Sequence, residues 1–281
     1  MKIDTAKSAT LSAKAKYKVP FGTVSVTPEA RQLINQALDS NWLTRGKFVQ
    51  EFEEEFAALF GVKHAVAVSS GTDADALACA VLYDHGAKRA DEIIIPALTF
   101  VATGNAVLQA GFTPVFVDIQ RETLNIDPER IEKAITAKTR AIMPVHLMGK
   151  PAEMDAILRI AKKHKLHVIE DAAEAHGAEY KGKKVGAIGD MAAFSLYAAH
   201  IVTTIEGGIV ITNDAAAAEA LRSLRNHGIV GKFEFRRIGF SAKMNELEAA
   251  VGLGNIKIFG QILAKRRRNL LYLIDKFKRF E

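Results

Sequence analysis

The sequence predicts an α/β fold in which a mostly parallel β-sheet is covered by helices on both faces. Short apolar or β-branched runs alternate along the chain with segments of helical periodicity, as they do when parallel strands are joined by helices. Many of these runs are apolar at successive positions, which is typical of strands buried on both faces. The predicted strands span residues 65–68, 92–95, 113–117, 141–145, 166–169, 191–196 and 208–212.

Two helices are predicted before the first strand. Thr27, Pro28 and Glu29 provide a hydroxyl cap, a proline at the first helical position and an acid in the first turn, which together indicate a helix start. This helix should end near Ser40. A second helix should end at Gly61, and its apolar face comprises Val49, Phe52, Phe56, Leu59 and Phe60. Further helical patterns occupy residues 72–83, 100–109, 127–135, 153–164 and 214–225.

The last part of the chain is also predicted to be helical. A longer helix is expected from Asn245 onward, with a break at Gly260, and one stripe of it comprises Leu247, Ala250, Val251, Gly254 and Ile258. Residues 265–281 place further apolar side chains among basic ones at roughly helical spacing, namely Leu270, Leu271, Leu273, Ile274 and Phe277.

The composition excludes several classes of protein. Of the 281 residues, 49% are hydrophobic and 25% are charged, so a disordered or collagen-like chain is excluded. No apolar run approaches the ~20 residues that span a bilayer, and residues 1–20 lack the apolar block of a secretory signal. We therefore expect a cytoplasmic protein that does not bind a membrane. Because Cys79 is the only cysteine, disulfides, multi-thiolate zinc sites and cysteine-held iron–sulfur clusters are excluded within one chain, and no metal site is predicted.

The charge is moderately basic. Lys and Arg number 38 against 32 Asp and Glu, which gives a net charge of +6, and the excess lies in residues 1–18 and 257–278. No aromatic-rich signature accompanies these segments, so we interpret them as solvated ends and helix faces and expect no nucleic-acid partner. The positive balance still permits an anionic small ligand.

The first loop with chemical potential covers residues 69–73, between the strand ending at Val68 and a helix. In parallel α/β sheets, ligands bind beyond the carboxyl ends of the strands. Small residues allow backbone N–H groups to approach a phosphate there, and hydroxyls and the helix dipole add to the attraction. A capped helix start without a ligand is the alternative interpretation, and the spacing leaves both open.

Three further loops carry candidate side chains. Phe100 follows a predicted strand and can stack over a planar ligand or lie in the core. Glu170 and Asp171 close another apolar strand, where a carboxylate can pair with a protonated ring nitrogen or can cap a helix or lie in a solvated turn. Ser195 and His200 lie in the last loop, where the histidine is either structural or catalytic.

Taken together and in this order, these loops resemble the DegT/DnrJ/StrS sugar aminotransferase family, within the fold-type I enzymes that use pyridoxal 5'-phosphate. The resemblance extends from about Val19 to Ile258 and implies the large domain of a fold-type I PLP-dependent transferase. The agreeing segments are residues 69–73, 96–100, 144–149, 170–177, 194–208, 226–228 and 244–252.

The resemblance implies a role for each matched residue. Gly71, Thr72 and Asp73 correspond to the turn that cradles the cofactor phosphate, and Ser195 to a phosphate-binding hydroxyl. Asp171 corresponds to the carboxylate that keeps the ring nitrogen protonated, which makes the cofactor an electron sink. Phe100 corresponds to the residue that stacks on the cofactor ring. Asn226 corresponds to the residue that reaches the phosphate of a neighbouring subunit, so the resemblance implies a homodimer.

His200 is the main departure from the family, because it occupies the position of the lysine that forms a Schiff base with the cofactor. Imidazole cannot form that bond, and nothing places Lys181, Lys183 or Lys184 at the same spot. A histidine here resembles the 3-dehydratases of nucleotide-linked 4-keto-6-deoxy sugars, which use pyridoxamine 5'-phosphate. His200 would then be the base that removes the cofactor C4' proton as the sugar C3 hydroxyl leaves. Glutamate would regenerate the amine form by transamination, as in relatives without an iron–sulfur cluster.

Two other features differ from the family. Glu174 stands where Gln or His is common near the cofactor ring oxygen, and its carboxylate would be repelled there unless it is protonated or turned away. The chain also ends soon after the long helix, where relatives continue into a smaller domain. We expect a basic tail at residues 1–20, a PLP-binding large domain at 21–258 and the start of a truncated C-terminal small domain at 259–281.

These residues lead to three hypotheses about the function. The leading one is a nucleotide-sugar 3-dehydratase whose partners are a nucleotide-linked keto sugar and glutamate as amino donor. The second is a sugar aminotransferase that lacks its Schiff-base lysine. The third is a non-catalytic, truncated remnant that retains affinity for the cofactor.

Overall fold

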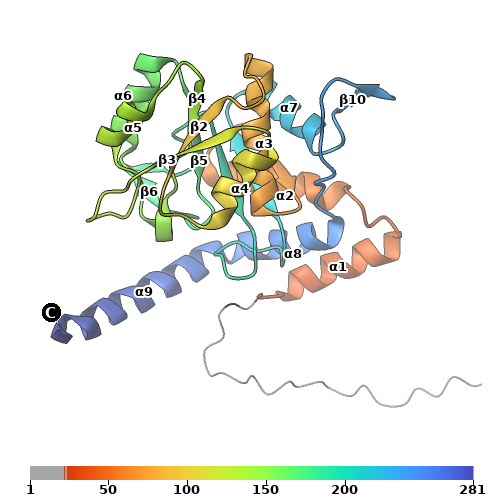
Figure 1. Cartoon of the computed structure of the whole chain (residues 1–281). Helices are drawn as coiled ribbons and strands as arrows, with labels where there is room; N and C mark the ends of the chain where they lie inside the picture. The colour runs from red at the N-terminus through yellow and green to blue at the C-terminus, as the bar shows by residue number, and fades with distance from the viewer. Residues whose placement is uncertain (1–21, 23, 281) are drawn as a thin grey trace, which may run out of the picture.

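A seven-stranded sheet with helices on both sides forms the centre of the protein (Figure 1). The computed structural model describes residues 22 and 24–280, so the predicted basic tail at residues 1–20 lies outside the described residues. Each of the seven predicted strands is present in this sheet. Their bounds are β1 His64–Val68, β2 Glu92–Pro96, β3 Thr113–Val117, β4 Thr139–Ile142, β5 His167–Asp171, β8 Met191–Ser195 and β9 Gly208–Thr212.

The strand order is β1-β9-β8-β5-β4-β2-β3. The pairs β5–β8, β4–β5, β2–β4 and β2–β3 are parallel, whereas β9 is antiparallel to both β8 and β1. The prediction of a mostly parallel sheet is therefore confirmed. Several bounds differ from the prediction by one to three residues. In particular, β4 covers Thr139–Ile142 rather than 141–145, and β5 extends to Asp171, because Asp171 still pairs with Ala193 of β8.

Helices α3 (Gly71–Ala80), α4 (Val101–Gln109) and α7 (Ala215–Leu224) pack on one face of the sheet. The opposite face of the sheet is covered by two groups of helices, which pack over different strands. Helices α1 (Pro28–Ser40), α2 (Lys47–Phe60) and α8 (Glu246–Lys257) form the first group, and α5 (Pro128–Ala134) and α6 (Met154–His164) form the second. Within β2, Ile93 and Ile95 face the layer of α3, α4 and α7, whereas Ile94 faces α5 and α6. This is the alternation that a strand requires.

The helix ends follow the predicted signals. Thr27 Oγ1 accepts a hydrogen bond from Ala30 N at 3.1 Å at the start of α1. Gly61, with φ of 73°, ends α2 in the left-handed conformation that glycine adopts without strain. Asn245 and Glu248 form a capping box at the start of α8.

Helix α9 (Phe259–Phe277) leaves α8 at an angle of 65°. The predicted break at Gly260 is wrong by two residues, because the chain leaves helical geometry at Ile258 (φ −101°, ψ 6°). The packing partners change there: α8 packs against α1 and α2, whereas Phe259 and Leu263 approach Gly177. None of the described helices meets the length and hydropathy of a membrane span alone, although α8 and α9 taken together do.

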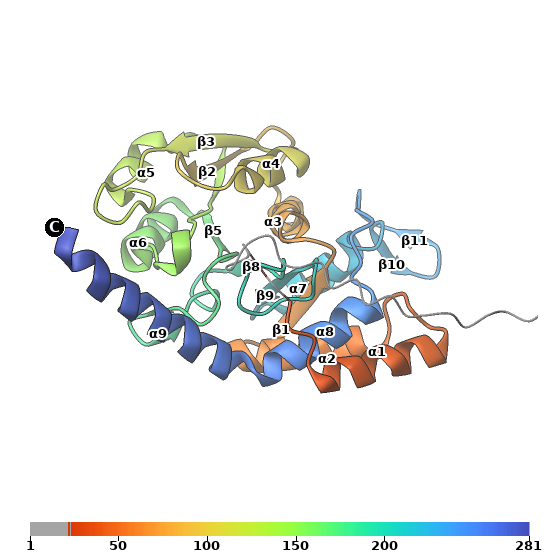
Figure 2. The same cartoon turned by 90° about the horizontal axis from the view of Figure 1, so that it is seen from below.

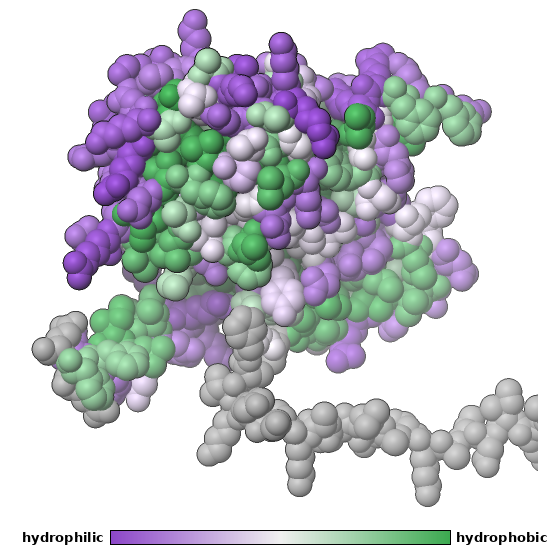
Figure 3. Space-filling model, viewed as in Figure 1, coloured by the Kyte–Doolittle hydropathy of each residue, from purple (hydrophilic) through white to green (hydrophobic). Residues whose placement is uncertain are grey.

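The second half of α9 extends beyond the rest of the molecule (Figure 2). Its apolar side chains gather on the surface at the lower left of Figure 3. Those exposed are Leu270, Leu271, Tyr272, Leu273, Ile274 and Phe277.

Two hairpins were not predicted. Strands β6 (Glu179–Tyr180) and β7 (Lys183–Lys184) pair across a turn in which Lys181 and Gly182 have positive φ. Strands β10 (Ile229–Gly231) and β11 (Glu234–Phe235) form the second hairpin, which projects from the body in Figure 1. Strands of two or three residues are too short to show a periodicity in the sequence.

Candidate cofactor and sugar site

Apart from Asn226, the candidate side chains lie at or just beyond the carboxyl ends of β1, β2, β5 and β8. These strands run in the same direction, so their carboxyl ends meet at one edge of the sheet. This edge is where α/β proteins bind ligands.

The loop after β1 forms a compact turn at the start of α3. Ser70 Oγ accepts a hydrogen bond from Asp73 N at 3.0 Å and so caps the start of α3. The Asp73 carboxylate accepts in turn from Ser69 Oγ at 2.6 Å and from Ser70 Oγ at 2.8 Å. Asp73 is therefore engaged in shaping the turn, and the N-terminus of α3 remains pointed at the edge of the sheet.

Gly71 and Ser195 lie in contact, although 124 positions separate them in the sequence. A Cβ atom on Gly71 would lie 2.6 Å from Ser195 Cβ and 2.9 Å from Ser195 Oγ. Only glycine lets this hydroxyl approach the start of α3. The combination of a helix N-terminus and an adjacent hydroxyl suits a phosphate group, so these residues fit the phosphate of the predicted cofactor.

Gly208 supports the same turn and was not identified from the sequence. A Cβ atom there would lie 2.0 Å from the carbonyl oxygen of Ser70. The start of β9 thus packs directly on the backbone of the turn. The Gly207-Gly208 pair is the signal in the sequence, because adjacent glycines often mark a close approach of two backbones.

Asp171 is only 4% exposed and lies at the end of β5. Its Oδ2 accepts a hydrogen bond from Thr103 Oγ1 at 2.7 Å and its Oδ1 accepts from Ala173 N at 3.2 Å. Burial raises the pKa of this carboxyl, the bonds to Thr103 and Ala173 oppose that rise, and the charge of Glu174 adds to it. A buried carboxyl of this kind would be strongly stabilised by a cationic partner, such as a protonated ring nitrogen.

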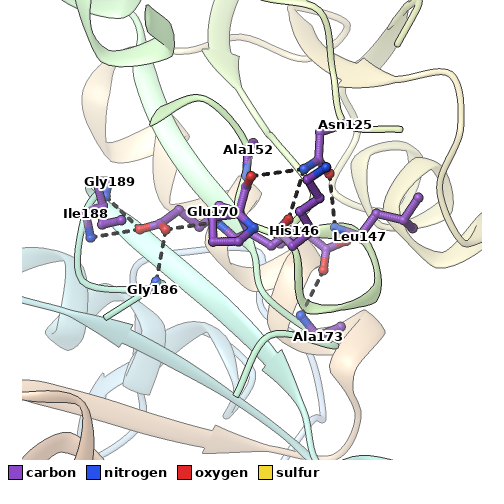
Figure 4. A network of polar contacts seen from close by, with 12 residues as sticks. Asn125, His146, Leu147, Ala152, Glu170, Ala173, Gly186, Ile188 and Gly189 are labelled. Carbon is purple, nitrogen blue, oxygen red and sulfur yellow. Dashed lines mark hydrogen bonds and ion pairs between the residues drawn. The ribbon is translucent and has the colours of Figure 1, made fainter. Parts of the chain in front are cut away.

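Glu170 serves a different purpose from its neighbour. It is fully buried and accepts hydrogen bonds from Gly186 N at 2.9 Å, Ile188 N at 2.9 Å and Gly189 N at 2.7 Å (Figure 4). It also lies 3.0 Å from His146 Nε2. Burial raises the pKa of Glu170, but His146 and the amide donors outweigh this effect and lower it. The Glu170 carboxylate therefore fixes loops behind the site.

His146, which follows β4, links the hydrogen bonds of Glu170 to the backbone of the neighbouring loops. Its Nδ1 accepts a hydrogen bond from Ala152 N at 3.0 Å, so its Nε2 carries the proton that it donates to Glu170. His146 N also donates to the carbonyl oxygen of Asp171 at 3.0 Å. The network thereby holds the backbone on which Asp171 is mounted.

Phe100 immediately precedes α4, and its side chain is 75% exposed. The interpretation of Phe100 as a core residue is therefore wrong, and its ring is free to stack on a ligand.

Glu174 is also exposed, and its Oε2 accepts a hydrogen bond from Met148 N at 2.7 Å. This bond holds the Glu174 carboxylate on the loop after β4.

His200 lies on a turn in which its own N–H donates to the Tyr197 carbonyl oxygen at 2.9 Å. Its half-buried ring lies 6.1 Å from the ring of His176 and 6.3 Å from that of Tyr197, measured between centroids. Burial lowers the pKa of His200, the charge of Glu174 opposes this, and Arg266 lowers it further. The neutral imidazole, which can accept a proton, is thus the favoured form at neutral pH.

His176 was not singled out by its chemistry in the sequence. It is 2% exposed, and neither ring nitrogen has a hydrogen-bond partner among the described residues. Burial, with smaller contributions from His200 and Arg266, lowers the pKa of His176 to about 3. Its ring therefore stays neutral beside His200.

The lysines that precede β8 lie elsewhere. Lys181 pairs with Asp155, and the Lys184 ammonium donates to the Leu59 carbonyl oxygen.

Asn226 is not hydrogen-bonded to another candidate residue in the described part of the chain. Its Oδ1 accepts from Lys243 Nζ at 3.2 Å, and Lys243 pairs through its backbone with Val68, the last residue before the first loop.

Comparison with known proteins agrees with this geometry. The sequence profile of the DegT/DnrJ/EryC1/StrS aminotransferase family matches residues 25–281. The GDP-perosamine synthase of Caulobacter vibrioides is 42% identical over 252 residues, which cover 89% of this chain and 67% of that protein.

Solved structures show the same relationship. The structure of Helicobacter pylori PseC, an aminotransferase involved in pseudoaminic acid biosynthesis, matches with a TM-score of 0.85 and 34% identity, over 92% of this chain and 70% of that one. The E. coli GDP-4-keto-6-deoxy-D-mannose-3-dehydratase with bound hydrated PLP matches with a TM-score of 0.86 and 33% identity, over 92% of this chain and 72% of that one. The fold and site thus define a fold-type I PLP-dependent transferase. More particularly, the chain belongs to the DegT/DnrJ/EryC1/StrS aminotransferase family.

Proposed function

We propose that this protein is a nucleotide-sugar 3-dehydratase that uses pyridoxamine 5'-phosphate and acts on a nucleotide-linked 4-keto-6-deoxy sugar. The observation that carries the proposal is His200, a half-buried imidazole with a lowered pKa, at the position that the resemblance assigns to the family's lysine. The similarity to a 3-dehydratase as well as to aminotransferases supports this assignment.

The residues that would hold the cofactor form two groups. Gly71, Thr72, Asp73 and Ser195 would bind its phosphate through the start of α3 and the adjacent hydroxyl. The ring would be held by Phe100 on its face and Asp171 at its nitrogen. Glu174 would lie near the ring oxygen with its carboxylate turned toward Met148 N, and Asn226 would reach the phosphate of a neighbouring subunit. When bound, the cofactor would supply a conjugated system that delocalises the electron pair released at C4' and passes it toward the departing C3 hydroxyl.

The protein's own contribution centres on His200. Its neutral ring would take up the C4' proton on its unprotonated nitrogen and would then be positioned to donate a proton to the departing C3 hydroxyl. The rings of His176 and Tyr197 are neighbours of the His200 ring. Asp171, buried and hydrogen-bonded to Thr103, would keep a proton on the facing ring nitrogen.

A sugar aminotransferase is the second candidate, favoured by the 42% identity to a GDP-perosamine synthase. The third is a non-catalytic remnant that binds the cofactor. One experiment separates all three: the protein is incubated with pyridoxamine 5'-phosphate, glutamate and a GDP- or dTDP-linked 4-keto-6-deoxy sugar. A 3-deoxy sugar with 2-oxoglutarate supports dehydration. A 4-amino sugar would show aminotransfer, and no turnover of either co-substrate would indicate a remnant.

We also propose a homodimer. Exposed apolar side chains surround the site edge, and a second subunit that supplies Asn226 would cover them. They include Leu98, Phe100, Val101, Met148 and Tyr197. Analytical ultracentrifugation of the purified protein tests this assembly, and a monomer at micromolar concentration would contradict it.

The division into domains is proposed at the α8–α9 bend. Residues 21–258 would form the cofactor-binding domain and residues 259–281 the start of a second, smaller one. The 65° bend and the absence of buried residues in α9 support this boundary. Limited proteolysis tests it: the first cleavage is expected within α9, and initial cleavage inside the sheet domain would contradict the division.

A further inference from the structure

Helix α9 touches the loop that carries His176. A Cβ atom on Gly177, which has a φ of 80°, would lie 2.9 Å from Phe259 Cζ and 2.9 Å from Leu263 Cδ2. The absence of a side chain at Gly177 therefore lets the first turns of α9 press against the backbone directly after His176.

The same helix also reaches the loop that carries His200. Arg266 Nη2 donates hydrogen bonds to the carbonyl oxygens of Ala199 at 2.9 Å and His200 at 3.1 Å. Phe259, Leu263 and Arg266 are spaced by four and three residues, so they share one face of α9. One helix face thus contacts both histidine loops, with apolar side chains on the first and a guanidinium on the second.

We propose that Arg266 is a positioning residue that holds the His200 loop and couples helix α9 to the site, an inference that rests on the proposed role of His200. The two carbonyl groups belong to consecutive residues. One guanidinium therefore holds both the peptide group before the His200 Cα and the peptide group after it. A shift of α9 would move this anchor and the Gly177 contact together.

The charges around His200 favour the same assignment. The groups that face its ring are Glu174 from the loop after β5, His176 on the same loop, Tyr197 from its own turn and Arg266 from α9. His176 is neutral, so Glu174 and Arg266 are the two opposing charges. Arg266 lowers the pKa of His200 and so favours the unprotonated ring that a base requires.

The test uses the full chain and four variants. Arg266→Met removes both hydrogen bonds and the charge, whereas Arg266→Lys keeps the charge. Arg267→Met is the matched control, because Arg267 is exposed on the same helix and forms no hydrogen bond or ion pair with the described residues. Hydrogen exchange is measured on peptides that contain the His200 amide, and the titration of the His200 ring is followed by NMR, with its signal assigned in a His200→Asn variant.

In Arg266→Met, we expect amide exchange in the His200 loop to be about tenfold faster than in the control, as the loss of two solvent-exposed hydrogen bonds implies. The His200 titration midpoint should rise in Arg266→Met and remain at the wild-type position in Arg266→Lys. Exchange and titration equal to those of Arg267→Met would overturn the proposal, as would an equal rise of exchange throughout the sheet. If His200→Asn still forms product, the proposed function fails, but the exchange result is unaffected.

Discussion

Glu170 and Asp171 are adjacent in the chain, yet their carboxyl groups bind on opposite sides of strand β5. Glu170 is held by His146 and three backbone N–H groups, whereas Asp171 is held by Thr103 from α4 and by Ala173 N. Because successive side chains of a strand point to opposite faces, one carboxylate secures the loops and the other faces the candidate site. Their pKa values accordingly move in opposite directions.

Replacing Glu170 should cost stability rather than chemistry. Glu170→Gln replaces the charged acceptor of three backbone N–H donors by a neutral amide, so we expect a loss of about 1–3 kcal/mol in the free energy of unfolding. The folded-state pKa of Glu170 is lowered, so its contribution is present above the unfolded pKa of ~4.3 and is lost as pH falls through the folded value. Urea unfolding measured between pH 3 and 7 checks this; an unchanged free energy at pH 7 would contradict it.

Asp171→Asn should impair function with little loss of fold. An amide cannot hold a proton on a facing ring nitrogen, so we expect a decrease of about 10²–10³ in product formation, while the melting temperature stays near that of the wild type. The exposed Asp118 provides the control variant Asp118→Asn. Product assays and thermal unfolding measure the two effects, and full activity of Asp171→Asn would refute the assigned role.

A methyl group at Gly71 should weaken cofactor binding. It would overlap Ser195 Cβ at 2.6 Å and displace the hydroxyl from the start of α3, at a cost of about 1–3 kcal/mol. We therefore expect Gly71→Ala to raise the dissociation constant for pyridoxamine 5'-phosphate by tenfold or more. Gly260→Ala is the control, since a Cβ there meets no atom within 4 Å. Fluorescence titration measures both, and equal affinities would exclude the proposed cradle.

Asp75 should make the protein less stable as pH rises. It is 3% exposed, and its Oδ1 has no hydrogen-bond partner in the described part of the chain. Burial, followed by the charge of Asp171, raises its pKa well above the usual range. The unfolded state therefore loses its proton first, and stability falls above the unfolded pKa of ~3.9 by up to ~1.4 kcal/mol per pH unit until the folded value is reached.

The Asp75→Asn variant removes this titration, so its free energy of unfolding should depend less on pH than that of the wild type. Urea unfolding at a series of pH values from 4 to 8 provides the comparison, with Asp118→Asn as the exposed control. Parallel pH profiles for Asp75→Asn and the wild type would show that Asp75 ionises normally in the folded state.

The strands were predictable because their apolar runs are contiguous and bounded by turn residues. The antiparallel direction of β9 was not predicted, although the sequence contains a signal: no helix lies between β8 and β9, and parallel neighbours need a crossover. The break between α8 and α9 was misplaced because a glycine suggested it, whereas a change of packing partners sets it at Ile258.

The site was predictable where its residues form local motifs. Gly71 stands three residues after the end of β1, and Asp171 is the last residue of β5, so an adjacent apolar run marks both in the sequence. Thr103 and Arg266 carry no such mark, because their partners lie 68 and 66–67 residues away. Side chains that act across such distances show no periodicity, so only the three-dimensional arrangement identifies them.

The absence of a covalent link at position 200 is the central claim, and borohydride reduction followed by peptide mass analysis tests it most directly. Wild-type protein loaded with pyridoxal 5'-phosphate should carry no phosphopyridoxyl group on any peptide. The His200→Lys variant should carry one at position 200, and His164→Lys, altered at a histidine of α6 that bonds to Glu132, should carry none. Stoichiometric labelling of a native lysine in the wild type would contradict the account.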